Sequence, residues 1–275
     1  MADLSWAEHN SRFVEDDQVL ELSYYEKKTN SYCTMTYNND AKTWFLDVLV
    51  MLSVHLILKG KSDDTNEGSV KHIFPTLQTV KQEGVSRKIS KMLKDQVGHV
   101  VGLDNKVSSH DIRYGSMDDM SRIALCDIIS IICRGGWAFE SECTAFRYVS
   151  QRMDVIRGGR ALSGYETPNL IAPQSSLKAI VFENLVQERK CFALMHKLFS
   201  ALPCSSVETD RLYSAKETLF ATLLENIESI DQATKWTDDN GKQHSNVLID
   251  TLKGSCLGEH IDYYQLLLWG KQVSY

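Results

Sequence analysis

Residues 108–148 read SSHDIRYGSMDDMSRIALCDIISIICRGGWAFESECTAFRY and contain, in order, a basic pair, an apolar run, a glycine pair and a tyrosine. His110 and Arg113 lie three residues apart, so on a helix their side chains share one face. The apolar run 123–133 predicts a buried helix that ends at the glycine pair 135–136. A further helix, expected from about residue 141 to residue 156, carries Tyr148. This order of residue types needs a functional explanation.

The rest of the chain predicts an α+β protein that is mostly α. Alternating or β-prone segments at 3–6, 19–24 and 31–37 predict a small antiparallel sheet. Apolar periodicity predicts further helices, at 43–58, 82–95, 176–201, 206–229 and 263–269. We therefore expect a small sheet packed on a helical catalytic domain (1–160), a linker rich in glycine and proline (161–175), and a helical C-terminal extension (176–275).

The composition is ordinary for a soluble globular protein: 275 residues, 43% hydrophobic and 24% charged, with room for one large or two modest domains. The seven cysteines are odd in number and form no CxxC pair, so neither a zinc site nor a redox dithiol is indicated. No signal peptide is visible, and the longest apolar run, 44–58, is too short to span a bilayer. We expect an intracellular protein with no membrane partner.

The net charge of −6 argues mildly against nucleic-acid binding, but the charges are unevenly distributed. Residues 81–113 hold seven basic side chains against four acidic ones, and most of the acidic excess lies beyond residue 183. A locally basic half is therefore joined to an acidic half. The candidate DNA-binding residues are Arg87, Lys88, Lys91, Lys94 and Arg147.

The residue types of the central stretch fit the transfer of a phosphodiester to a protein side chain. A tyrosine beside basic groups can attack phosphorus, and the planar guanidinium of arginine binds two phosphate oxygens. An imidazole can manage the tyrosine proton, and a lysine can protonate the leaving 5′ oxygen. The sequence offers no carboxylate or His/Cys cluster, so a metal-dependent nuclease is disfavoured and we expect no metal or cofactor.

This order of motifs resembles the catalytic domain of the tyrosine recombinase (phage integrase-like) family, especially the eukaryotic branch of Crypton-type transposons. That family carries His-x-x-Arg, then a helix, then Gly-His or Gly-Trp, and then a tyrosine. The matching residues here are His110, Arg113, Trp137 and Tyr148. In the KKTN turn before the segment 31–37, Lys28 matches the family's β-hairpin lysine, with Lys27 as the alternative. The resemblance covers about residues 1–155.

The resemblance implies a site-specific recombinase or integrase that acts on double-stranded DNA in the nucleus, as a homo-oligomer on the DNA. Tyr148 is then the nucleophile that forms a 3′-phosphotyrosyl link. Arg113 and His110 hold the scissile phosphate. Trp137 buttresses that phosphate, and Lys28 protonates the leaving group.

One part of the family pattern is missing from this sequence. The first catalytic arginine of the family lies just before a strand that here begins directly after the initiator methionine. We therefore expect that arginine and the DNA-clamping N-terminal domain to lie outside this truncated chain, and activity to be impaired. The alternative is a non-catalytic, mostly helical DNA- or protein-binding protein derived from a mobile element.

Overall fold

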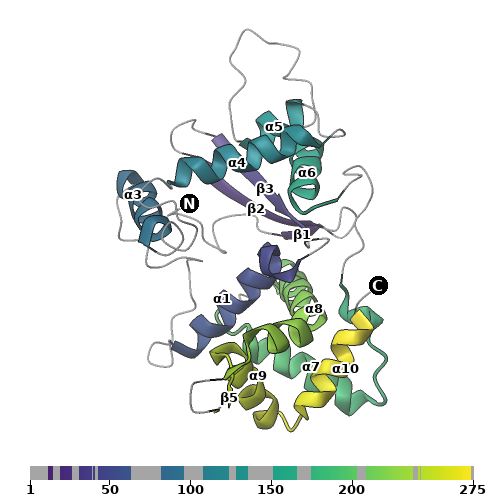
Figure 1. Cartoon of the computed structure of the whole chain (residues 1–275). Coiled ribbons are helices and arrows are strands. Elements are labelled where there is room, and N and C mark those ends of the chain that lie inside the picture. Colours follow the sequence, from purple (N-terminus) through teal and green to yellow (C-terminus); the bar gives the residue numbers. More distant parts are fainter. Residues whose placement is uncertain are drawn as a thin grey trace. The chain divides into compact units, whose positions relative to one another are not determined.

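The computed structural model describes residues 12–14, 19–26, 31–38, 40, 43–62, 82–95, 108–123, 128–135, 151–165, 175–202, 209–237, 241 and 243–273. Helices dominate these residues, which confirms the mostly α class (Figure 1). The chain divides into two compact units. Unit 1 takes its described residues from Leu22–Thr36 and Lys71–Leu170, and unit 2 takes its own from Ser11–Glu21, Tyr37–Val70 and Ile171–Tyr275.

Three strands near the N-terminus form a sheet in the order β1-β2-β3. They are β1 (Arg12–Val14), β2 (Val19–Glu26) and β3 (Ser31–Tyr37). β1 runs antiparallel to the first residues of β2, with Phe13 opposite the buried Leu20. The segments expected at 19–24 and 31–37 lie within β2 and β3, β1 was not expected, and the segment 3–6 lies outside the described residues.

Unit 1 contains four described helices: α3 (Gln82–Leu93), α4 (Ser109–Arg122), α5 (Ile128–Gly135) and α6 (Gln151–Leu162). The last three pack around Met120, Ile131 and Ala161, one from each helix (Figure 1). Arg134 ties α5 to β3, because its Nη1 donates a 2.7 Å hydrogen bond to the carbonyl oxygen of Thr36. The core of this unit is therefore a three-helix contact next to a strand.

Two expectations for this part of the chain are wrong in detail. The run 123–133 is not one helix, because α4 ends at Arg122 with extended backbone at Ile123 and the next helix begins at Ile128. The helix expected to end at about residue 156 continues to Leu162, through the second glycine pair at 158–159. A Cβ on Gly158 would lie 2.8 Å from Cε of Met120, so this glycine permits close packing of α6.

Unit 2 is built around the long helix α8 (Thr209–Thr234). The helices packed on it are α1 (Val48–Ser62), α7 (Leu185–Leu198) and α10 (Tyr263–Val273), and α9 (Val247–Gly258) contacts α1, α7 and α10. Unit 2 also contains two 3₁₀ turns, η1 (Trp44–Leu46) and η4 (Leu177–Ala179), and a two-strand ladder, β4 (Trp236–Thr237) with β5 (Gln243–His244). The strand β1 belongs to this unit too and contacts α8.

α1 belongs to this unit because its apolar stripe meets α8. Its buried residues are Leu49, Val50, Ser53, Leu56 and Ile57, which have the spacing of one helix face. The Ser53 hydroxyl lies 2.7 Å from the carbonyl oxygen of Leu49 and 2.9 Å from that of Leu219 in α8. The expected boundary at 160–175 assigned this helix to the N-terminal domain, whereas its contacts place it with the C-terminal helices.

The start of α1 is formed by a buried carboxyl group. Asp47 Oδ1 accepts hydrogen bonds from the backbone N–H groups of Leu49 (2.7 Å) and Val50 (3.1 Å), and Oδ2 accepts one from Asp40 (2.9 Å). Burial raises the pKa of Asp47 to about 6, although these three hydrogen bonds act in the opposite direction. Asp47 therefore acts as the N-cap of α1, although burial destabilises the charged form of its carboxyl group.

α10 approaches the backbone of α8 closely at Gly270. A Cβ on this residue would lie 2.3 Å from the carbonyl oxygen of Leu224, so only glycine fits the observed position. The close approach buries three α10 side chains, Leu266, Trp269 and Val273.

The helices of unit 2 differ from expectation in two places. The segment 176–201 is a 3₁₀ turn followed by α7, because the Asn184 side chain accepts hydrogen bonds from the N–H groups of Val186 and Gln187 and so starts a new helix. α9 was not expected, although Asn246 caps it in the same way.

Candidate functional site

The His-x-x-Arg motif lies in the first two turns of α4, and the sequence explains why the helix begins there. The Asp111 carboxylate accepts hydrogen bonds from the backbone N–H (2.7 Å) and the hydroxyl (2.6 Å) of Ser108, the residue just before the helix. These bonds lower the pKa of Asp111, with the hydroxyl as the larger cause, and the neighbouring His110 lowers it further. The negative charge of Asp111 is therefore engaged at the helix start.

His110 and Arg113 are both exposed and, three residues apart, share one side of α4, as the spacing predicted. Tyr114 joins them, because its ring centroid lies 5.7 Å from that of His110 and the residue is 69% exposed. The motif reading of the sequence missed Tyr114. Tyr114 could have been predicted from its spacing, because a residue four positions after His110 lies on the same side of a helix.

α3 contacts the beginning of α4 through two serines. The backbone N–H of Ser109 donates a 3.1 Å hydrogen bond to Oγ of Ser90, and the two hydroxyl oxygens lie 3.4 Å apart. Arg87 and Lys94 are three residues before and four after Ser90, so they share its side of α3. Arg113 is four residues after Ser109 and shares its side of α4. The serine contact therefore places the Ser90 side of α3 next to the beginning of α4.

We call this region the α3–α4 surface and define it by six residues: Arg87, Lys88, Lys91, Lys94, His110 and Arg113. All are exposed except Lys94, which is half-buried. Over residues 82–95 four basic side chains face two acidic ones. A structure that gathers cations in this way can hold an anion with several negative charges.

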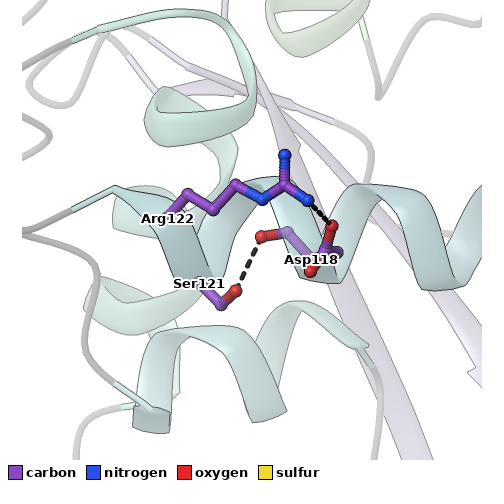
Figure 2. A network of polar contacts seen from close by, with 3 residues as sticks. All are labelled: Asp118, Ser121 and Arg122. Atoms are coloured by element: carbon purple, nitrogen blue, oxygen red, sulfur yellow. Dashed lines mark hydrogen bonds and ion pairs between the residues drawn. The ribbon is translucent and has the colours of Figure 1, made fainter.

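The opposite end of α4 has a different character. Near its C-terminus Asp118 accepts a charge-assisted hydrogen bond from Arg122, and the Ser121 hydroxyl donates a 2.7 Å bond to the backbone carbonyl of Asp118 (Figure 2). The ion pair is largely exposed, so it contributes at most ~1 kcal/mol to stability. Arg122 therefore belongs to an ion pair within α4 and is not counted in the α3–α4 surface.

Six of the ten predicted site residues are described, and they lie in α3 or directly after it and in the first two turns of α4. The other four lie outside the described residues: Lys28, Trp137, Arg147 and Tyr148. The complete catalytic set stays a prediction.

Within the described ranges, no three His, Cys, Asp or Glu side chains lie close enough together to hold a metal ion. No helix in the described part of the chain has the length and apolar character needed to cross a membrane. The chain matches no protein-family model, no curated protein and no solved structure.

Proposed function

We propose that this chain is a DNA-binding protein of the tyrosine recombinase type, which holds the phosphate backbone on the α3–α4 surface. The observation that supports the proposal is the arrangement of His110 and Arg113 on one exposed side of α4, beside a basic helix that the Ser90–Ser109 contact holds in place. Lysine and arginine side chains on such a surface contact phosphates and release counterions from DNA.

In this proposal Arg113 and His110 bind the scissile phosphate, and Tyr148 attacks it to form a 3′-phosphotyrosyl link. The phenolic oxygen of Tyr148 bonds to phosphorus as the bond from phosphorus to the 5′ oxygen breaks. His110 accepts the phenolic proton, and Lys28 supplies a proton to the leaving 5′ oxygen. Trp137 buttresses the phosphate. Arg87, Lys88, Lys91, Lys94 and Arg147 contact the DNA backbone away from the reacting bond.

The DNA-binding part is tested by the salt dependence of affinity for duplex DNA. We expect log K to fall steeply with log salt, and the double change Lys88→Gln with Lys91→Gln to reduce the slope by about 2, since each lost phosphate contact removes about 0.9. The control is Lys253→Gln, an exposed lysine of α9 in the other unit. Salt-independent binding, or an equal effect of the control change, would contradict the proposed surface.

The catalytic part is tested with a nicked suicide substrate, which traps the covalent protein–DNA adduct. Wild-type protein is expected to form the adduct and Tyr148→Phe to form none, because the phenylalanine ring has no nucleophilic oxygen. Arg113→Lys is expected to reduce adduct formation, since lysine cannot make the bidentate contact to phosphate. DNA binding without any adduct from wild type favours the non-catalytic alternative.

A further inference from the structure

Tyr114 is a large aromatic side chain in the first half of α4, and it has no role in the phosphate binding proposed above. It is 69% exposed, which is high for a tyrosine, because its ring usually finds apolar cover. It lies on the same side of the helix as His110, with the two ring centroids 5.7 Å apart. Its neighbour in sequence, Arg113, belongs to the α3–α4 surface.

An exposed aromatic ring beside basic residues fits single-stranded nucleic acid better than a duplex. In a duplex, the faces of the bases are covered by their stacked neighbours, so a side chain reaches only base edges and the backbone. In a single strand the faces are available, and proteins that bind single strands combine a basic groove with aromatic rings on which bases stack. His110 lies one turn before Tyr114 on the same side of α4 and can contact a phosphate while Tyr114 lies beside the attached base, because residues four apart on a helix are about 5–6 Å apart.

We infer that the α3–α4 surface binds DNA whose bases are unpaired, and that Tyr114 is the residue on which a base stacks. This inference rests on the proposed DNA-binding function and narrows its substrate to single-stranded DNA or to duplex with an opened segment. It concerns the binding of the strand and is independent of whether Tyr148 reacts.

The inference is tested with the full chain by fluorescence anisotropy, using labelled oligo(dT) and a blunt duplex of the same length. Oligo(dT) is expected to bind more tightly than the duplex at the same salt concentration. Tyr114→Ala is expected to weaken oligo(dT) binding about tenfold, because one stacked base is lost, and to leave duplex binding nearly unchanged. Tyr114→Phe keeps the ring and is expected to restore most of the affinity.

The matched control is Ile112→Ala on the same helix. Ile112 is 52% exposed, and its position two residues before Tyr114 places it on a different side of α4. This change is expected to leave both affinities as they are. Circular dichroism of each variant checks that the helices are intact. We expect unchanged spectra, because Tyr114 and Ile112 are both largely exposed and their truncation removes little packing.

The outcomes separate the inference from the proposed function. Duplex binding equal to or tighter than oligo(dT) binding, with no effect of Tyr114→Ala, overturns the inference; the DNA-binding proposal stands if the Lys88 and Lys91 changes still weaken duplex binding. Failure of wild type to bind either DNA overturns both. Tighter binding of oligo(U) than of oligo(dT) overturns the assignment to DNA.

Discussion

Replacement of Gly270 by alanine tests how closely α10 is seated on α8. The added Cβ would lie 2.3 Å from the carbonyl oxygen of Leu224, which takes part in the backbone of a helix and cannot rotate away. Cβ atoms essentially never approach a heavy atom within 3.0 Å, so the helices must separate by about 0.7 Å (3.0 − 2.3) at least. The whole contact must open to accommodate one methyl group.

The cost of that separation follows from the side chains beside Gly270. Leu266, Trp269 and Val273 are almost fully buried, and burial of each is worth ~2 kcal/mol. A gap of 0.5–1 Å forfeits about a quarter to a half of the dispersion attraction, so about 2–3 kcal/mol is lost in all. Alanine recovers up to ~1 kcal/mol of helix propensity. We expect Gly270→Ala to lower the free energy of unfolding by ~1–2 kcal/mol.

The matched control is Gly254→Ala in α9, where a Cβ would meet nothing within 4 Å. Here only the propensity gain operates, and stability is expected to rise by ~0.5–1 kcal/mol. Urea unfolding followed by far-UV circular dichroism, with m-values compared among the three proteins, measures both changes. If Gly270→Ala is as stable as wild type or more stable, while the control behaves as expected, the close approach of α10 to α8 is refuted.

Two further predictions concern stability. Because burial raises the pKa of Asp47 to about 6, its contribution to stability is fully present below about pH 4, where the unfolded chain also holds the proton, and is lost as pH rises through 6. The loss amounts to ~3 kcal/mol in order of magnitude. Asp47→Asn is expected to flatten this part of the profile of unfolding free energy against pH, because asparagine does not titrate. The variant is also expected to be less stable at every pH, since its amide NH₂ would face a backbone N–H. An unchanged slope would contradict the raised pKa of Asp47. In unit 1, Gly158→Ala is expected to destabilise by ~1–3 kcal/mol, since the Cβ would lie 2.8 Å from Met120, whereas Gly115→Ala, with open space around it, is expected to stabilise slightly; equal thermal midpoints for the two variants would contradict the packing of α6.

Local signals in the sequence were enough to locate several elements. The amphipathic pattern of 82–95 corresponds to α3, and the apolar periodicity of 206–229 corresponds to most of α8. The spacing of His110 and Arg113 placed them correctly on one side of a helix. In each case the determining interactions are within a few residues of one another.

Other features depend on contacts between distant residues, which local patterns cannot reveal. The glycine pair 158–159 looks like a helix stop, but Gly158 is small because Met120 and Arg134 lie against it. Its counterpart at Gly135 does end α5, and the two pairs have the same local appearance. The contact between Ser90 and Ser109 joins residues 19 positions apart in the sequence, so the neighbouring position of α3 and α4 could be found only from the structure.

Unit 2 contains segments that are far apart in the sequence and are therefore synthesised at different times. Roughly 150 residues separate the end of α1 from the start of α8, the helix that buries its apolar stripe. At 5–20 residues per second, that stripe is synthesised about 7–30 s before the start of its partner. During this interval Leu49, Val50, Leu56 and Ile57 have no α8 to cover them. The nascent chain thus carries an uncovered apolar face early in its synthesis, and a fragment that stops at residue 160 would lack the helix that covers this face.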